Sequence, residues 1–273
     1  MSNPKNVSGT AFIIAAFRDE ENEAESPLYT DQVVQLFLND DIKETAKDIA
    51  QNFPAAKEMI KLRTKYFDDI LSQQIALSYQ QVVILGSGLD TRPVRQNMAG
   101  VTYFEIDTKA TVQLKEDTFK SNNIAANVHY IPGDYVKDGL VSLLNQTSFN
   151  FEIPTYILWE GNTTLIQKQD VISVLKQIRD NFHNFHLSFD YMSDKVISRT
   201  TGYDDINDYI ERYEKLYTPW ITGFDNIEPL AKDLGFKVIE NFSITELFNK
   251  YRPNRSLESN LFYFYFVCTL ELF

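Results

Sequence analysis

The stretch Gln81–Asp107, QVVILGSGLDTRPVRQNMAGVTYFEID, decides the fold. It begins with the apolar run Val82–Leu85, which is typical of a strand buried on both faces of a parallel sheet. Gly86 and Gly88 follow, and a glycine turn lets the backbone approach a ligand that a Cβ would keep away. A helix opened by a proline comes next, and then a second strand that ends at Asp107. The stretch therefore predicts strand, glycine turn, helix and strand.

The residues around the glycine turn favour one kind of cofactor. Asp107 stands about 20 positions after the turn, where an acidic residue can accept hydrogen bonds from ribose hydroxyls. A dinucleotide fingerprint would place a third glycine where this chain has Thr91, and the neighbouring Asp90 would repel a pyrophosphate. The turn therefore predicts a cationic cofactor without phosphates, S-adenosylmethionine (SAM). The alternative is a turn that only joins a strand to a helix in some other α/β protein.

Composition limits the classes of partner. A chain of 273 residues suits one domain, and the net charge of −12 argues against nucleic acid and anionic membranes. No apolar run has the length of a membrane span and no signal-peptide core is visible, so we expect a cytoplasmic protein. The single cysteine, Cys268, lies in an apolar run and predicts a buried thiol. The three histidines have no metal-binding spacing, so no metal site is predicted.

Strand and helix patterns alternate through residues 81–190, and each of five strands runs into a polar or glycine residue. Ligands of open α/β sheets bind outside the carboxyl ends of the strands, so these residues should converge. Carboxylates at the ends of these strands would attract a sulfonium cation and accept hydrogen bonds from ribose hydroxyls. Asp134 and Tyr135 could bind and cover an adenine, or they could form a simple turn. The five residues are Gly86, Asp107, Asp134, Glu160 and Asp190.

The flanking segments complete one domain, 1–273. Residues 1–80 predict a helical cap, and its long helix carries Arg63. The Arg63 side chain is either a solvated surface charge or a guanidinium that binds a carboxylate. Residues 191–225 are rich in tyrosine and predict a helical lid, or else a helical insertion with its aromatic residues packed on the core. Residues 226–273 predict the C-terminal part of the sheet, with strands over 236–242 and 260–270.

Four motifs together resemble the leucine carboxyl methyltransferase family of SAM-dependent methyltransferases. They are LRTKYFDDIL, VVILGSGLDTR, YFEID and ILWEG, in the family's order and spacing. The resemblance covers most of the chain. It implies the class I methyltransferase fold, a Rossmann-like α/β architecture with a seven-stranded sheet whose last strand is antiparallel.

The resemblance also implies roles for individual residues. Arg18 stands where relatives often have an arginine, and it would touch cofactor or substrate. Thr164 departs from the family, because many relatives have a tyrosine there, and it would border the substrate together with Tyr191. The cofactor residues would be Arg63 at the methionyl carboxylate, Gly86 in the turn, Asp107 at the ribose, Asp134 and Tyr135 at the adenine, and Glu160 at the methionyl amine.

These features predict an O-methyltransferase that acts on a carboxylate or hydroxyl of a small molecule by in-line transfer. A carboxylate acceptor needs no general base, whereas a hydroxyl does, and the sequence assigns none. Three alternatives stay open: a methyltransferase for a protein C-terminal carboxyl, an NAD(P)-dependent Rossmann oxidoreductase, and an inactive binding module with the same fold.

Overall fold

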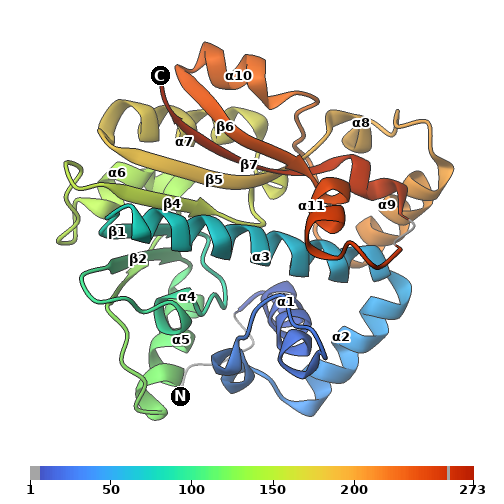
Figure 1. The fold of residues 1–273 in the computed structure, drawn as a ribbon, viewed down its shortest axis with the longest axis horizontal. Helices are drawn as coiled ribbons and strands as arrows, with labels where there is room; N and C mark the ends of the chain where they lie inside the picture. Colours follow the sequence, from blue (N-terminus) through green and yellow to red (C-terminus); the bar gives the residue numbers. More distant parts are fainter. Residues whose placement is uncertain (1–6, 257–258) are drawn as a thin grey trace.

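One seven-stranded sheet organises the protein, and the computed structural model describes residues 7–256 and 259–273. The strand order is β3-β2-β1-β4-β5-β7-β6 (Figure 1). The first five strands are parallel, and β7 is antiparallel to both β5 and β6. The predicted class I methyltransferase sheet is therefore confirmed. The strands are β1 (Gln81–Leu85), β2 (Thr102–Asp107), β3 (Val128–Pro132), β4 (Thr155–Trp159), β5 (Phe185–Met192), β6 (Phe236–Ser243) and β7 (Tyr265–Leu272).

Helices cover both faces of the sheet. In Figure 1, α3 crosses the front, with α9 and α11 beside it, whereas α6 and α7 lie behind and α10 lies at the top. The α-helices are α1 (Gly9–Asp19), α2 (Asp40–Asn52), α3 (Pro54–Ala76), α4 (Arg92–Arg95), α5 (Lys109–Ser121), α6 (Leu140–Leu144), α7 (Lys168–Asn181), α8 (Asp194–Ile197), α9 (Asp204–Leu216), α10 (Ile227–Asp233) and α11 (Ile244–Tyr251). Short helical turns are η2 (Glu20–Glu23), η3 (Gln32–Phe37), η4 (Tyr135–Gly139), η5 (Thr163–Leu165) and η6 (Asn260–Tyr263).

The apolar strands explain this layering. Side chains alternate across a strand, so β1 sends Val82 and Ile84 into the layer under α3, and Val83 and Leu85 into the layer under α6 and α7. All four are buried, as the continuous apolar run predicted. The parallel strands therefore sit between two cores and bring their carboxyl ends to one edge.

Two strand boundaries differ from the sequence prediction. The predicted strand over 260–270 begins only at Tyr265, because Asn260–Tyr263 forms a 3-10 turn in which the Phe264 N–H donates to the Leu261 carbonyl. Strand β5 continues to Met192, because residues 187–192 pair with β7. Tyr191, which we expected in the lid segment, is therefore part of the sheet.

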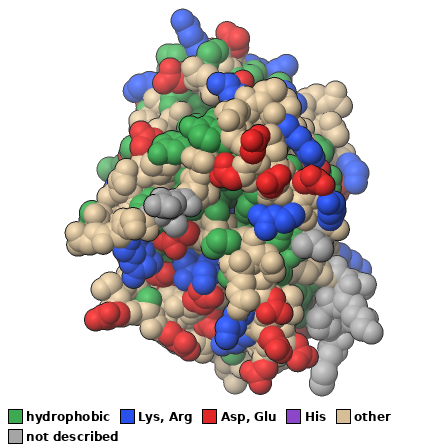
Figure 2. Space-filling model, turned by 90° about the vertical axis from the view of Figure 1, so that its right-hand side faces the viewer, with side chains coloured by type: hydrophobic (Ala, Val, Ile, Leu, Met, Phe, Trp, Pro, Cys, Tyr) green, Lys and Arg blue, Asp and Glu red, His purple; other side chains and the backbone are tan. Residues whose placement is uncertain are grey.

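The outer surface carries charge of both signs. Acidic and basic side chains are interspersed on the face drawn in Figure 2, with hydrophobic side chains between them. Within the described part of the chain, every helix is too short or too polar to cross a membrane.

Candidate functional site

A cavity of about 240 Å³ lies at the carboxyl ends of β1, β2 and β4. Its walls come from five places that are far apart in the sequence, and α1 supplies one side of it. The lining residues are Ser8, Thr10, Ala11, Ile14 and Arg18; Arg63; Ile84 and Gly86 to Asp90; Asp107 and Thr111; and Glu160 to Asn162 with Leu165. A wider groove of about 680 Å³ beside α11 contains none of the predicted site residues.

The glycine turn after β1 forms the floor of the cavity. Gly86 and Gly88 have φ of 62° and 50°, in the left-handed region that side chains disfavour. Asp107, at the end of β2, accepts the Gly88 N–H through Oδ2 at 2.7 Å and the Thr108 N–H through Oδ1 at 2.6 Å. The Asp107 carboxylate therefore holds the turn and also lines the cavity.

Arg63 reaches the cavity from α3 and is fixed by groups from three strands. Its Nε donates to Glu160 Oε1 at 3.1 Å, and its Nη1 donates to Asp190 Oδ2 at 2.9 Å and to the Tyr265 hydroxyl at 2.8 Å. Its Nη2 lies beside Gly161, where an added Cβ would be only 2.8 Å away. Burial would lower the pKa of Arg63, but Tyr265, Asp190 and Glu160 raise it, so the guanidinium stays charged.

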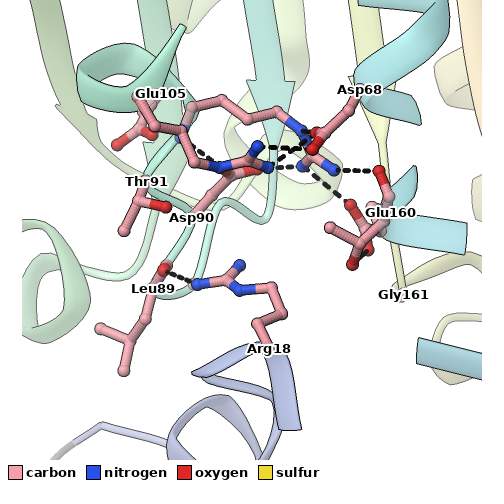
Figure 3. A network of polar contacts seen from close by, with 12 residues as sticks. Arg18, Asp68, Leu89, Asp90, Thr91, Glu105, Glu160 and Gly161 are labelled. Atoms are coloured by element: carbon pink, nitrogen blue, oxygen red, sulfur yellow. Dashed lines mark hydrogen bonds and ion pairs between the residues drawn. The ribbon is translucent and has the colours of Figure 1, made fainter. Parts of the chain in front are cut away.

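Arg92 joins the glycine turn to Glu160. This side chain is fully buried, and its Nε donates to Asp68 Oδ1 at 2.7 Å. Its Nη1 donates to Asp90 Oδ2 at 2.5 Å and to Glu160 Oε2 at 2.8 Å (Figure 3). Burial would raise the pKa of Asp90, but the Arg92 charge holds it well below its usual range. Glu160 therefore lies between two guanidiniums, those of Arg63 and Arg92.

Arg18 ties α1 to the glycine turn. Its Nη2 donates to the Leu89 carbonyl at 2.5 Å (Figure 3), and its Nε lies 3.4 Å from Asp31 Oδ2. Asp31 in turn accepts the Thr91 hydroxyl at 2.7 Å. One buried cluster therefore connects the helix, the η3 segment and the turn, and Arg18 also lines the cavity.

The structure separates the predicted site residues into two groups. Arg18, Arg63, Gly86, Asp107 and Glu160 meet at the cavity. The other four residues, Asp134, Tyr135, Thr164 and Tyr191, do not line it.

Asp134 and Tyr135 follow β3, next to β2. Asp134 Oδ1 accepts the Val136 N–H at 3.0 Å, and its Oδ2 pairs with Lys137 at 3.0 Å. The buried Tyr135 hydroxyl accepts the Trp159 indole N–H at 3.0 Å. The local turn and the core therefore use both side chains, and the proposed adenine contact stays a prediction.

Thr164 and Tyr191 are buried away from the cavity. The Thr164 carbonyl accepts the Ile221 N–H at 2.8 Å. Tyr191 is 1% exposed, and its hydroxyl donates to Asn241 Oδ1 at 3.0 Å. Tyr191 occupies the core because it lies on the paired part of β5, and its contact with a substrate stays a prediction.

The 191–225 segment packs elsewhere as well. Tyr209, Tyr213 and Tyr217 place their rings 5.0–6.3 Å from the Phe53 ring, between α2 and α3. Trp220 stacks on Tyr213 with a centroid separation of 4.4 Å. No residue of this segment lines the cavity in the described structure, whereas α1 contributes several.

Two functional side chains escaped the sequence reasoning. Arg92 is the last residue of VVILGSGLDTR, and its place in the DTR triplet after the glycine turn was an available signal. Asn162 stands two residues after Glu160, lines the cavity and bonds to the glycine turn. Nothing in its sequence context distinguished it from a loop asparagine.

Comparison with known proteins gives the following matches. A model of the family described as leucine carboxyl methyltransferase matches residues 11–179. A Streptomyces coelicolor protein assigned as a SAM-dependent methyltransferase is 29% identical over 189 residues, which is 64% of this chain and 65% of that protein. One from Streptomyces avermitilis is 31% identical over 141 residues, 47% and 48% of the two chains. The chain thus spans between about half and two thirds of the curated relatives it matches.

Solved structures share the fold. A Thermobifida fusca protein assigned as a methyltransferase has a TM-score of 0.59 at 15% identity, over 95% of this chain and 94% of that one. A DUF574 family protein from Streptomyces avermitilis has a TM-score of 0.63 at 10% identity, over 94% and 96%. Magnesium protoporphyrin IX methyltransferase from Synechocystis, with bound SAH, has a TM-score of 0.51 at 10% identity, over 96% and 99%.

Proposed function

The chain belongs to the leucine carboxyl methyltransferase family, and from this membership we propose that it transfers a methyl group from SAM to an oxygen of a small molecule. The observation that carries the proposal is the cavity at the carboxyl ends of the strands. There one guanidinium and two carboxylates, from Arg63, Asp107 and Glu160, surround a glycine turn. This set of groups matches the charges of SAM.

The residues fit SAM in both charge and free bonding capacity. The charged side chains that line the cavity are three carboxylates, from Asp90, Asp107 and Glu160, and two guanidiniums, from Arg18 and Arg63, so the lining is net negative and suits a cationic ligand. The buried Ser87 hydroxyl has no hydrogen-bond partner among the described residues, and it lines the cavity. An orphaned buried hydroxyl is costly unless a ligand or water satisfies it.

Each side chain has a separate part in holding the cofactor. Arg63 would bind the methionyl carboxylate through a guanidinium that Asp190 and Tyr265 orient. Glu160 would face the methionyl ammonium, and Asp107 would accept the ribose hydroxyls. SAM itself supplies a methyl group already activated by the sulfonium.

The surroundings of the cavity favour a carboxylate as acceptor. A hydroxyl acceptor needs a base, but no histidine lines the cavity in the described part of the chain. Asp190 is a poor base, because Arg63, Tyr265 and the Gly161 N–H already use its oxygens. A carboxylate is a nucleophile at neutral pH, so positioning and exclusion of water suffice.

Isothermal titration calorimetry tests the cofactor. We expect the wild type to bind SAM and S-adenosylhomocysteine (SAH) but not NAD. Asp107→Ala should weaken SAM binding by at least about tenfold, or ~1.4 kcal/mol. Asp233→Ala removes an exposed carboxylate at the end of α10 and should bind like the wild type.

The possible outcomes separate the candidate functions. NAD binding without SAM binding would support the oxidoreductase instead. SAM binding should lead to a screen of carboxylates, hydroxyl compounds and peptides with a free C-terminus, with SAH release as the signal. Turnover confined to peptides would replace the small-molecule acceptor with a protein C-terminus. SAM binding with no turnover of any acceptor would favour the inactive binding module.

A further inference from the structure

Asn162 has an unusual set of contacts in the cavity wall. Its Nδ2 lies 2.7 Å from the Glu160 carbonyl, 3.2 Å from the Gly86 carbonyl and 3.4 Å from the Leu85 carbonyl. A side-chain amide has only two N–H donors, so three carbonyl oxygens converge on one amide group. The side chain thus links the end of β4 to the glycine turn after β1.

The glycine turn accommodates this amide. A Cβ on Gly86 would lie 2.6 Å from both Nδ2 and Oδ1 of Asn162, closer than real Cβ contacts allow. Gly86 is therefore needed for more than its left-handed backbone, because only a residue without a side chain leaves room for Asn162. From the sequence alone, the absence of a side chain at Gly86 was expected to make room for the cofactor only.

The amide oxygen is left as an available acceptor. Nδ2 is held by the carbonyls, whereas Oδ1 accepts no hydrogen bond from the described residues. Oδ1 is also not among the fully buried atoms that lack a partner, and Asn162 lines the cavity. An accessible carbonyl-type oxygen therefore stands in the wall, held by the contacts of its own NH₂ group with the three carbonyls.

The neighbouring carboxylate is already shared. Glu160 Oε1 accepts from Arg63 and Glu160 Oε2 accepts from Arg92, so two guanidiniums draw on its lone pairs. A cation bound beside Glu160 gains less from this carboxylate than from a free one. A second acceptor close to Glu160 would complete the coordination of an ammonium group.

We propose that Asn162 Oδ1 is a further cofactor-binding acceptor that positions the methionyl ammonium of SAM beside Glu160. This inference rests on the proposed function. The three carbonyls hold the amide in one orientation, so that its oxygen faces the ligand and its nitrogen does not. A hydrogen bond to a charged group is worth about 1.5–3 kcal/mol, which corresponds to a change in affinity of tenfold or more.

Two ligands and two variants test the assignment by calorimetry. SAH carries the ammonium, whereas 5′-methylthioadenosine has the same nucleoside without the amino-acid end. Asn162→Ala should weaken SAH binding by about tenfold and change methylthioadenosine binding by less than about twofold. Asn145→Ala removes an exposed asparagine after α6 and should change neither affinity.

Asn162→Asp distinguishes an anchored amide from a simple cation site. An added carboxylate should tighten SAH binding if only charge matters. Our assignment predicts weaker SAH binding, because a carboxylate cannot donate to the three carbonyls and would turn away from them. Tighter SAH binding by Asn162→Asp would overturn the assignment.

Methylthioadenosine also reports whether the variant site is folded. If Asn162→Ala binds neither ligand, the same two titrations are made with Asn162→Ser. A serine hydroxyl still donates to a carbonyl but lacks the amide oxygen. Equal losses for the two ligands in Asn162→Ser would assign Asn162 a purely structural role. Failure of the wild type to bind SAH would instead count against the proposed function.

Discussion

At the scale of single residues, the Arg92 guanidinium connects Asp68, Asp90 and Glu160 in a fully buried position. Burying charges is costly, and the cost is offset only while every partner is present. The network therefore contributes a fixed geometry at Glu160 more than it contributes net stability.

We expect Arg92→Met to lower the free energy of unfolding by about 3–5 kcal/mol, because it leaves buried carboxylates without a counter-charge. Urea denaturation followed by circular dichroism measures the change. Arg179→Met is the control, since Arg179 pairs with Asp180 on the surface and its removal should leave the midpoint nearly unchanged. A wild-type midpoint for Arg92→Met would mean that the buried carboxylates do not depend on the Arg92 charge.

The Glu105–Lys115 pair makes stability depend on pH. Both side chains are fully buried and lie 2.5 Å apart. Burial raises the pKa of Glu105 from 4.5 to about 7, and Lys115 only partly opposes this. The folded state therefore keeps a proton that the unfolded state loses, and the free energy of unfolding should fall as pH rises through this window.

Urea midpoints measured between pH 4.5 and pH 7.5 test this prediction. Glu105→Gln cannot titrate, so we expect a shallower fall than in the wild type. Glu116→Gln, an exposed neighbour on α5, should follow the wild-type curve. Identical slopes for Glu105→Gln and the wild type would show that Glu105 titrates at an ordinary pKa in the folded protein.

At the scale of elements, α1 acts as the roof of the cavity. Thr10, Ala11, Ile14 and Arg18 recur at the spacing of one helix face and all line the cavity. The Ala11 Cβ lies 3.9 Å from the position that a Cβ on Gly88 would take. The roof is therefore close to the glycine turn, and a small residue keeps the space between them open.

Filling that space should exclude the ligand. We expect Ala11→Phe to weaken SAM binding by at least about tenfold while the protein stays folded, because the ring would enter the cavity. Calorimetry measures the affinity, and circular dichroism checks the fold. Ala125→Phe, at an exposed alanine after α5, should bind as the wild type does. Unchanged affinity in Ala11→Phe would show that α1 does not cover the bound cofactor.

At the scale of the whole molecule, a ligand held by α1, α3 and three strands should stabilise the entire fold. SAM at 100 times its dissociation constant should add about 2.7 kcal/mol to the free energy of unfolding. For a domain of this size we expect a rise in Tm of about 5–10 °C. Differential scanning calorimetry should show this shift with SAM and SAH but not with NAD. A shift with NAD alone would point to a different cofactor.

Most of the fold could be predicted because its signals are local. Apolar runs such as Val82–Leu85 mark buried strands, and Gly86 and Asp107 mark the turn beside them. The final strand was predicted to start too early, because Leu261 and Phe262 are as apolar as the strand that follows. Their burial comes from the 3-10 turn, and hydrophobicity alone does not distinguish the two conformations.

The site was only partly predictable, because its remaining contacts join distant segments. Asn162 looks ordinary in sequence and Arg92 is marked only by its place in a motif, and the contacts of both appear only when β4 and the glycine turn meet. The tyrosines of residues 191–225, in contrast, are conspicuous in the sequence, but the sequence does not show what they pack against. Their number left open a lid or an insertion packed on the core; the rings of Tyr209, Tyr213 and Tyr217 pack around Phe53, and the helix that lines the cavity is α1.

The position of α1 also bears on how the chain folds during synthesis. The ribosome completes this helix long before it makes β1, β2 and β4, whose ends the helix covers. Ile13 and Phe17 find their partners in α2 and α3 soon afterwards, but Phe12 packs in a cluster that includes Leu89 and Phe119, so part of this helix stays uncovered until those residues are made, and such exposed apolar surface favours aggregation. Pulse proteolysis of stalled nascent chains should therefore find α1 fully protected only after Phe119 has left the ribosome.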